Sequence, residues 1–551
     1  MTRPYRNMRV PVLPSPSRSW YVTLAGAFAA LGLALFAYSF QLRHGDIVSG
    51  LRDPGRGGAA WALYIAAYVY FVGVSFAGIT VASMARIFHL DVLKPLTRIA
   101  ELLTIVSLCA GALMVLADLG RPLDGLIKLP MLARPSSPFF GTFTLVVSGY
   151  LFSSVIYFFV SGRRDAAKMF VLGPRILKPI YWLWASGYRG TPEEHARHSR
   201  TSFWLALTIV PLLIVAHSTL GFIFGIQSGR PGWYSALQAP AFVVMAGVSG
   251  TGALIVISLI LRRMLKLDID DSAIHWLGNF LWILSLVYVY FLIVEELTAS
   301  YAAPAMDRHV AHEVIAGRYA LSYWLMAACL FLTFLIPFLL YLLRKKSTGW
   351  IAVAAVLGNV AAVLKRLLIV VPSQTHGSML ASFEGDYVPT WIEWAVVSGA
   401  AGLVLIAILL FGAIFPLVPG HQPPLVRTLP LPKDPVRGLV TLLWALAAIG
   451  FILFGLSDSF RLWSGTEIDP SIPFSPVIFA NGVILIFTTA VIYEILPTHL
   501  LEKPWHRRLV QKAHFSIPRA PKLALGSRSI RAFDRQAPAT ELPRQTGDTH
   551  E

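Results

Sequence analysis

The stretch "YIAAYVYFVGVSFAG", Tyr64–Gly78, carries no charged residue, and a six-residue segment similar to its last six positions appears later in the chain. The segment "GVSFAG" (Gly73–Gly78) is echoed by "GVSGTG" (Gly247–Gly252). Small residues at such spacings let two helices approach closely inside lipid. The echo therefore predicts two related helical units, each built around one copy. Chance similarity between two short motifs of small residues is the alternative.

The composition around this stretch is that of a membrane protein. Of 551 residues, 56% are hydrophobic and 14% are charged, whereas a soluble chain carries about 25% charged residues. Apolar runs of about 20 residues, each long enough to cross a bilayer as a helix, recur along the chain. The sequence predicts an all-α polytopic membrane protein with about 12 transmembrane helices. The predicted spans lie near 20–40, 60–87, 99–117, 139–160, 203–224, 239–261, 274–297, 319–343, 350–371, 391–415, 439–457 and 477–496.

The spans and the echo together predict a core of two four-helix bundles, formed by spans two to five and six to nine, with extra helices around it. We expect six segments: an N-terminal cytoplasmic segment with the first helix and an outer loop (1–58), the first bundle (59–230), the second bundle (231–390), an additional helix (391–416), two C-terminal extra helices (417–500) and a basic, disordered cytoplasmic tail (501–551).

The distribution of positive charge predicts the orientation of the chain. With the N-terminus placed in the cytoplasm, 34 of the 46 Lys and Arg residues fall on the cytoplasmic side. This bias follows the positive-inside rule and predicts a multi-pass membrane protein with both termini cytoplasmic. The membrane that we expect is the bacterial inner membrane. The net charge of +17 is then explained by topology and by contact with lipid headgroups, so it does not indicate a nucleic-acid partner.

The two cysteines, Cys109 and Cys329, lie alone in apolar runs, and the sequence has no CxxC or CxxCH motif. Iron–sulfur clusters and c-type haems need such cysteines. We therefore expect no iron–sulfur cluster and no c-type haem on this chain. A haem b with two His ligands is not expected either, because His217 has no second buried His at a matching depth, and no other metal is expected. Any such centre would belong to a partner protein.

Asp118 stands out among the polar residues of the spans, because it lies at the C-terminal end of an apolar run in "ADLGRP" (Ala117–Pro122). A helix C-terminus favours a cation there, not an anion. One interpretation is an interfacial pair with Arg121. The other is a carboxylate that faces a pocket with His217 and exchanges protons with a bound redox ligand. A buried histidine such as His217 can also serve only to join two helices.

Further polar residues in the spans need a partner or a cavity, because a charge near the bilayer centre costs about 2.5–3.5 kcal/mol. Tyr64 and Tyr68 share a helix face and could equally be interfacial anchors. Lys365 and Arg366 lie together inside one span, and a bridge to Glu295, Glu296 or Glu393 could neutralise them. The candidate proton-path residues are His275, Asn279, Ser285, Tyr288, Asn359, Arg366 and Glu393; scattered hydrogen bonds between helices explain them equally well.

Five stretches carry a family resemblance. They are the opening segment Tyr64–Gly78; "ADLGRP"; the central pair "AHSTLGFIFG" (Ala216–Gly225) and "RPGWYSALQAPAFVVMAGVSG" (Arg230–Gly250); "GRYALSYWLMAACLFLTFLIP" (Gly317–Pro337); and "PTWIEWAVVSGAAG" (Pro389–Gly402). In this order they resemble the NrfD/PsrC family, the quinone-reactive membrane subunits of polysulfide reductases and of alternative complex III. The resemblance covers about residues 20–416, and the last two spans and the tail depart from it.

The resemblance implies a quinone- or quinol-binding subunit of a respiratory oxidoreductase, acting on menaquinone or ubiquinone. It implies electron transfer to an extracytoplasmic ferredoxin-like iron–sulfur subunit, with a multihaem cytochrome c or molybdopterin subunit and other membrane subunits as further partners. Proton translocation is left open. The implied catalytic residues are Asp118 and His217, and the implied quinone-binding residues are Tyr64, Tyr68, Asp118, Arg121, His217, Glu295 and Glu296. A secondary transporter and an inert membrane anchor are the alternative functions.

Overall fold

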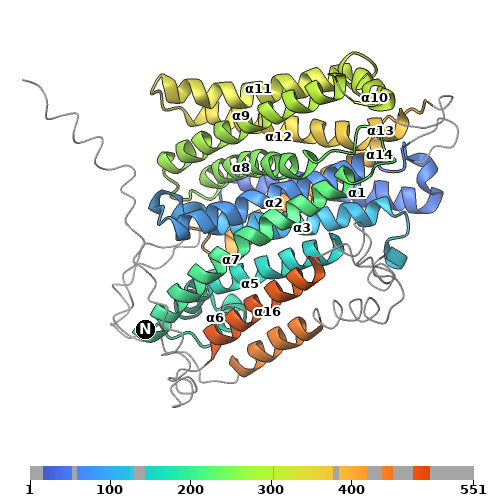
Figure 1. Cartoon of the computed structure of the whole chain (residues 1–551). Helices are drawn as coiled ribbons and strands as arrows, with labels where there is room; N and C mark the ends of the chain where they lie inside the picture. The colour runs from blue at the N-terminus through green and yellow to red at the C-terminus, as the bar shows by residue number, and fades with distance from the viewer. Residues whose placement is uncertain are drawn as a thin grey trace, which may run out of the picture. The chain divides into compact units, whose positions relative to one another are not determined.

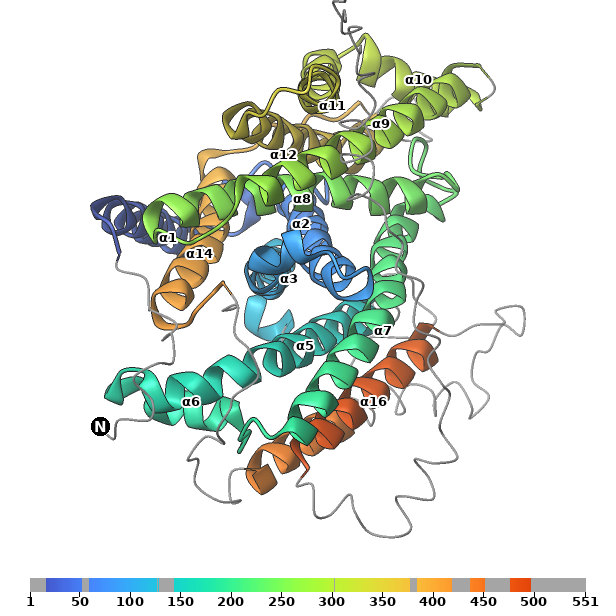
Figure 2. The same cartoon turned by 90° about the vertical axis from the view of Figure 1, so that its left-hand side faces the viewer.

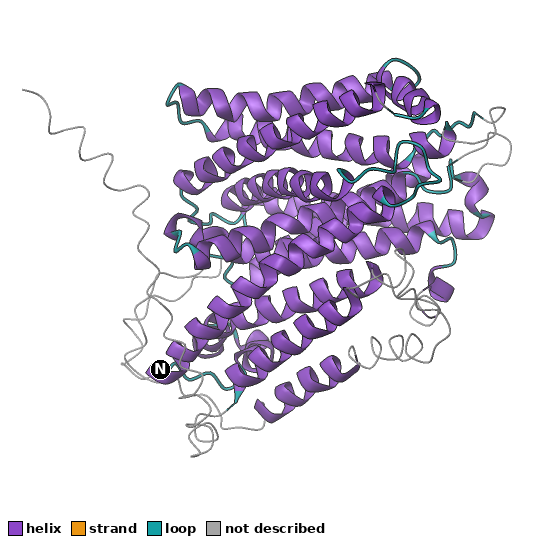
Figure 3. Ribbon diagram, viewed as in Figure 1, coloured by secondary structure: helices purple, strands orange, loops and turns teal. Residues whose placement is uncertain are grey.

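The computed structural model describes residues 16–51, 59–125, 127, 143–301, 303–376, 384–418, 437–450 and 476–496. These residues all belong to one compact unit, Met1–Leu496. Every regular element in the described ranges is a helix (Figure 3). The predicted tail, 501–551, lies outside them.

Nine spans in the described ranges are long and apolar enough to cross a membrane. This confirms the prediction of a polytopic all-α membrane protein. The helices that form these spans are α1 (Arg18–His44), α2 (Leu63–Ile87), α3 (Thr97–Asp118), α7 (Pro192–Gly225), α8 (Gln238–Met264), α9 (Asp271–Tyr301), α11 (Ala320–Leu342), α12 (Thr348–Val370) and α14 (Trp391–Ile414).

The other three predicted spans also coincide with described helices, but these are less clearly membrane-spanning. Helix α5 (Phe143–Leu172) has 30 residues, and its second half carries charged residues such as Arg163 and Asp165. The helix Arg437–Gly450 is short, and α16 (Pro476–Ile495) has 20 residues. The number of about 12 spans therefore stays a prediction. Three shorter helices are α6 (Lys178–Ala185), α10 (Ala305–Ile315) and α13 (Pro372–Thr375).

Helix α2 lies at the centre of the fold (Figure 2). It packs against α3 and α7, which lie near it in the chain, and against α8 and α12 from further along. Around it, α3, α5 and α7 contact one another in turn, and α9, α11 and α12 do the same beside α8. Helix α1 pairs with α14, and α16 lies on α5 and α7. A helix surrounded in this way must be apolar on every face, as the opening stretch is.

Glycines of the two echoed segments lie where α2 and α8 meet their neighbours most closely. A Cβ atom added to Gly78 would lie 1.9 Å from the carbonyl oxygen of Ala100 on α3. One added to Gly73 would lie 3.2 Å from Oγ of Ser249 on α8, and one added to Gly252 would lie 2.8 Å from the carbonyl oxygen of Ala355 on α12. Small residues thus set the distances between these helices.

Replacing Gly78 with alanine should destabilise the protein, because the new methyl group overlaps backbone and α3 must move away. Overpacking of this kind typically costs about 1–3 kcal/mol, and a clash with backbone lies at the upper end. Gly26→Ala on α1 is the matched control, since a Cβ there meets nothing within 4 Å. The measurement is the thermal midpoint of the detergent-solubilised protein. Equal midpoints for the two variants would contradict the packing described here.

Buried ion pairs fasten the C-terminal helices to the first half of the chain. Arg163 on α5 contacts Glu494 on α16 at 2.9 Å, and each side chain is 1% exposed. The Arg163 guanidinium also donates to the carbonyl oxygens of Ala185, Ser186 and Glu494 at 2.7–3.0 Å. Arg437 contacts Glu194, near the start of α7, at 2.8 Å. The predicted C-terminal extra helices therefore pack on their own chain.

Candidate functional site

Most of the predicted site residues lie at one end of the helices, which we call the Asp118 end. Here α1, α3, α7, α9 and α12 finish and α2, α8, α11 and α14 begin. The short helices α10 and α13 mark this end on the right of Figure 1. Within it the predicted residues fall into two groups, one around Tyr64 and one around Glu295.

The first group, which we call the Tyr64 cluster, consists of Tyr38, Gln41, Asp46, Tyr64 and Asp118. The fully buried Tyr64 hydroxyl donates to Oε1 of Gln41 at 2.7 Å. Gln41 Nε2 donates in turn to Oδ1 of Asp46 at 3.0 Å. This hydrogen-bonded series connects the first turn of α2 with the segment that follows α1.

The Asp118 carboxylate closes this cluster from α3. Asp118 is 3% exposed and interacts electrostatically with Tyr64. Helix α3 ends at Asp118, and the chain turns at Gly120, which has φ +66° in the left-handed region. A Cβ at Gly120 would lie 3.2 Å from Oδ2 of Asp46, so glycine lets the loop pass close to this second carboxylate. The buried Asp118 and Tyr64 and the partly exposed Asp46 thus lie close together.

Two residues that were predicted to lie beside Asp118, Arg121 and Tyr68, lie outside the Tyr64 cluster. Arg121 lies beyond the end of α3 and is exposed. The Tyr68 ring is buried one turn further along α2, where it lies 3.5 Å from the position of a Cβ on Gly111 of α3. Tyr68 therefore lies beneath the Tyr64 cluster, and Arg121 outside it.

His217 lies deeper in the bundle than the Tyr64 cluster. Its Nε2 is 3.0 Å from the carbonyl oxygen of Val72 on α2, and its Nδ1 is 2.8 Å from that of Leu213 on α7. Val72 is eight residues beyond Tyr64, roughly 12 Å along the helix. A neutral imidazole donates to one of these carbonyls and an imidazolium to both. His217 therefore joins α7 to α2, and both carbonyls are placed to accept from the protonated ring.

Glu393, at the start of α14, holds together three segments next to the Tyr64 cluster. The side chain is fully buried. Its Oε1 accepts from the Tyr387 hydroxyl at 2.7 Å, and its Oε2 accepts from the backbone N–H groups of Gly50 and Thr390, both at 3.0 Å. Leu63 N–H donates to the Tyr387 oxygen at 3.1 Å. Burial, and then the charge of Glu393, raise the pKa of Tyr387, so this hydroxyl keeps its proton and donates.

Glu393→Gln should lower the stability of the protein, because an amide offers one accepting oxygen where the carboxylate offers two. Leaving one buried donor without an acceptor costs about 1–3 kcal/mol. Glu384→Gln is the matched control, since Glu384 precedes the same segment and its side chain is 67% exposed. Thermal midpoints in detergent measure the effect. If the thermal midpoint of Glu393→Gln equals that of Glu384→Gln, Glu393 does not hold these segments together.

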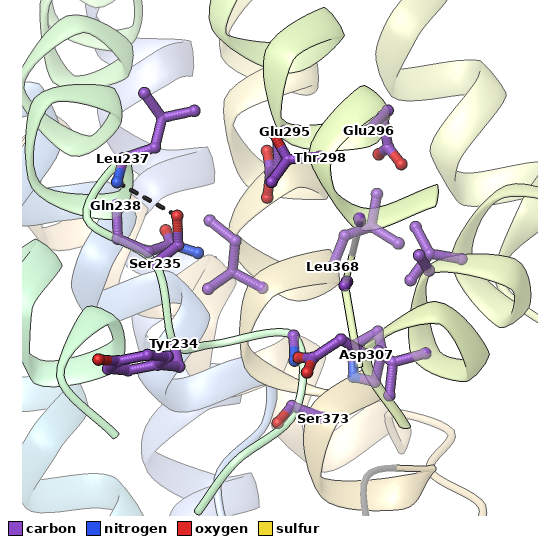
Figure 4. A pocket seen from close by; sticks show the side chains of 18 of the residues that line it. Tyr234, Ser235, Leu237, Gln238, Glu295, Glu296, Thr298, Asp307, Leu368 and Ser373 are labelled. Atoms are coloured by element: carbon purple, nitrogen blue, oxygen red, sulfur yellow. Dashed lines mark hydrogen bonds between the residues drawn. The ribbon is translucent and has the colours of Figure 1, made fainter. Parts of the chain in front are cut away.

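The second group lines a pocket of about 450 Å³ between α8, α9, α10 and α12. Figure 4 shows Glu295, Glu296 and Gln238 around it, with Asp307 and Ser373 on another part of its wall. Lys365 Nζ donates to Oε2 of Glu295 at 2.7 Å; Lys365 is 6% exposed and Glu295 is 30% exposed. Glu296 is hydrogen-bonded to Tyr323 of α11.

The neighbouring Arg366 is arranged differently from the predicted alternative of a bridge to Glu295, Glu296 or Glu393. Lys365, and not Arg366, contacts Glu295. The Arg366 guanidinium lies 4.0 Å from the centroid of the Phe242 ring, and its Nη2 donates to the Phe242 carbonyl oxygen at 3.5 Å. A cation over an aromatic face gains part of the stabilisation that a carboxylate would supply.

The other predicted proton-path residues occupy several depths. His275 lies at the opposite end of α9, where its Nδ1 is 2.6 Å from the Asp271 carbonyl oxygen. Asn279 is partly buried one turn further along. Ser285 donates to its own helix at Leu281, and the buried Tyr288 interacts electrostatically with Lys365. Asn359 accepts from the Tyr70 hydroxyl at 2.8 Å and so joins α12 to α2. A proton route through these residues stays a prediction.

A set of aromatic rings lies between the two groups. The Trp61 ring stacks on Trp233 with centroids 6.1 Å apart, and Phe224 packs edge-on against both. Trp61 and Gln374 exchange two hydrogen bonds of 2.9 and 2.7 Å. The Trp233 indole N–H donates to the carbonyl oxygen of Ile369, a residue of the pocket wall. The pocket and the Tyr64 cluster are therefore separate regions with a packed aromatic boundary.

Several residues of the two groups escaped prediction. Gln41 and Asp46 follow the first predicted span, 20–40, in its outer loop, and their depth alone could have indicated them. Tyr387 and Ser373 lie in connecting segments without periodicity, so no local pattern marks them. Within the described ranges, no group of three or more His, Cys, Asp or Glu side chains is placed to hold a metal ion.

A family model described as "Polysulphide reductase, NrfD" matches residues 55–376. The membrane component of a putative dimethyl sulfoxide reductase of Halobacterium salinarum is 32% identical over 291 residues, which are 52% of this chain. The match covers 62% of the length of that relative.

Two further relatives match over 72% of this chain and 93% of their own lengths, each at 24% identity. One is a subunit of the selenate reductase of Mesobacillus selenatarsenatis. The other is the Hdr-like menaquinol oxidoreductase integral membrane subunit of Archaeoglobus fulgidus. The matched family region ends at residue 376, so α14 and the C-terminal helices lie beyond it.

Proposed function

The chain belongs to the polysulphide reductase NrfD family, and we propose from that premise that it is the quinone-reactive membrane subunit of an oxidoreductase complex. The names of the relatives support this proposal, because one is a membrane subunit of a menaquinol oxidoreductase and two are subunits of reductases. Menaquinone and ubiquinone are both candidate substrates. Electrons and protons would be exchanged with the quinone pool at the Asp118 end.

The observation that carries the proposal is the Tyr64 cluster. A quinol gives up two protons when it is oxidised, so its site needs buried groups that accept them. Asp118 and Asp46 supply carboxylates, and Gln41 and Tyr64 form a hydrogen-bonded series from Asp46 to the first turn of α2, beside Asp118. His217 would hold a further proton below, between two backbone carbonyls. In this assignment Asp118 accepts a proton, and Tyr64 positions the head group.

We further propose that the Asp118 end faces out of the cytoplasm and carries the redox partner. The excess of Lys and Arg in the opposite loops favours this orientation, with cytoplasmic termini in a bacterial inner membrane. The partner would be a ferredoxin-like iron–sulfur subunit, itself bound to a multihaem cytochrome c or molybdopterin subunit. The arrangement makes this chain the quinol-oxidising or quinone-reducing part of the complex.

Extraction of the purified complex with organic solvent tests the proposal. We expect at least one quinone per copy of this chain, and oxidation of an added short-chain quinol with electrons delivered to the partner subunits. A complex without quinone and without this activity would contradict the proposal. Transport of a solute by the chain alone would indicate a secondary transporter. If the complex contains no quinone and deletion of this chain only prevents the partner subunits from assembling, the chain is an inert membrane anchor.

A further inference from the structure

The pocket beside Glu295 has features of a binding site that the Tyr64 cluster does not explain. Its volume of about 450 Å³ falls within the range of about 300–1,000 Å³ that is usual for sites of small organic ligands. Its wall is mainly apolar, from residues such as Leu237, Val310 and Leu368. Polar side chains, including Gln238, Glu296 and Asp307, interrupt this wall (Figure 4). Such a mixture is typical of sites for amphipathic ligands.

Two groups in the wall have hydrogen-bonding capacity left over. The Ser373 hydroxyl is buried, with 2% of the residue exposed, and has no hydrogen-bond partner among the residues that the structure describes. A buried hydroxyl without a partner costs about 1–3 kcal/mol, which a ligand oxygen would offset. Lys365 has three N–H donors, and Glu295 takes one of them. Both residues line the pocket.

The charges in the wall exclude some ligand classes. Glu295 neutralises Lys365, and Asp307 adds negative charge without a further Lys or Arg among the described residues of the wall. A phosphate or carboxylate group would therefore be repelled. A neutral ring with two oxygens suits the site better, because its carbonyls accept from Lys365 and Ser373 and its hydroxyls donate to the carboxylates.

One side of the pocket adjoins a lipid-facing surface. Val294 and Thr298 line the pocket on α9, while Ile293 and Leu297, which immediately precede them, are 60% and 67% exposed. Exposed apolar side chains on a membrane helix face lipid. A ligand held in the pocket can thus extend an apolar tail along α9. The acids of α9 also stand one span after "GVSGTG", as Asp118 stands one span after "GVSFAG".

We propose that this pocket is a second quinone site, separate from the Tyr64 cluster. The head group hydrogen-bonds to Lys365 and Ser373, and the carboxylates of Glu295 and Glu296 accept from the reduced form. The proposal rests on the proposed function, because it assumes that the chain binds quinones. It adds that each chain holds two of them, one on each side of the aromatic boundary.

Photolabelling of the intact complex with a short-tailed azido-benzoquinone tests this site. In the wild-type complex we expect label on peptides that contain residues 294–299, 307–314 or 368–373. Ala311→Phe places a ring in the pocket and should lower that labelling at least tenfold, whereas Ala305→Phe, on the exposed side of the same helix, should not. Ser373→Ala removes only a hydroxyl and should also weaken labelling of the pocket. It serves as the test if the Ala311→Phe complex does not assemble.

The outcomes separate this proposal from the proposed function. Label confined to peptides around Tyr64 and Asp118 would overturn the second site and leave the function standing. The absence of label anywhere would overturn both. Labelling of the pocket that is unchanged in Ala311→Phe and Ser373→Ala would also overturn the second site. A phospholipid retained in the wild type and lost in Ala311→Phe, without quinone label, would show a lipid site instead.

Discussion

Asp118→Asn should lower quinol oxidation by the purified complex about 10²- to 10⁴-fold, the range that a positioned general base contributes. Asparagine has nearly the same shape as aspartate but cannot accept a proton at neutral pH. Asp118 is buried beside Tyr64, at a helix C-terminus that disfavours a negative charge by about 0.3–1 kcal/mol. A carboxylate kept in so unfavourable a position is expected to have a chemical task.

The matched control is Asp124→Asn, which changes an exposed acid six residues further along the same segment. It should leave turnover within about twofold of the wild type. Co-purification of the partner subunits with each variant shows that assembly is intact, and extracted quinone shows that binding is retained. Wild-type turnover by an assembled Asp118→Asn complex would remove Asp118 from the proton-accepting role.

Glu494→Gln should destabilise the packing of α16 by about 3–5 kcal/mol, the usual cost of leaving one member of a buried ion pair without its partner. Arg163 is 1% exposed, and Glu494 supplies the carboxylate that it contacts. The remaining carbonyl acceptors satisfy its N–H groups but not its charge. We expect a lower thermal midpoint and faster proteolysis after α16.

Two comparisons make this test specific. Asp271→Asn breaks the exposed pair with Arg262 and should cost no more than about 1 kcal/mol. The double variant Arg163→Met/Glu494→Leu removes both charges and should recover most of the loss, because apolar residues can replace a buried pair. Equal midpoints for Glu494→Gln and Asp271→Asn would contradict the assignment of Arg163 and Glu494 as the fastening pair.

The helices could be predicted from the sequence because each apolar run has about 20 residues, which is the length that a helix needs to cross a bilayer and more than a buried β-strand needs. The runs near Trp20 and Trp391 correspond to α1 and α14, whose bounds differ from the predicted ones by a few residues. Helix α10 was not predicted, because it has 11 residues of mixed polarity and shows no apolar run. The docking of α16 was not predicted either, since the partner of Arg163 lies 331 residues away along the chain.

The candidate site could be predicted only as a set of depths. Asp118, Tyr64 and Glu295 were recognised because polar residues near one end of the spans are costly in lipid. The depth of a residue in the membrane does not reveal which neighbouring helix its side chain faces. The sequence therefore placed Asp118 and Glu295 around one head group, whereas the structure puts the aromatic rings of Trp61 and Trp233 between their two regions. Likewise, it did not reveal which of Lys365 and Arg366 contacts Glu295.

The close contacts of α2 also bear on the alternative of a carrier. Alternating access requires one bundle to rock against another across an interface that can slide. The central helix α2 approaches α8 closely at Gly73 and α3 closely at Gly78. At these two glycines no side chain of α2 separates the helices and lets them slide past each other. Rocking would have to break these close contacts. The packing of α2 therefore favours a fixed arrangement of the helices, which would suit the proposed role of keeping a redox ligand at a constant distance from its electron acceptor.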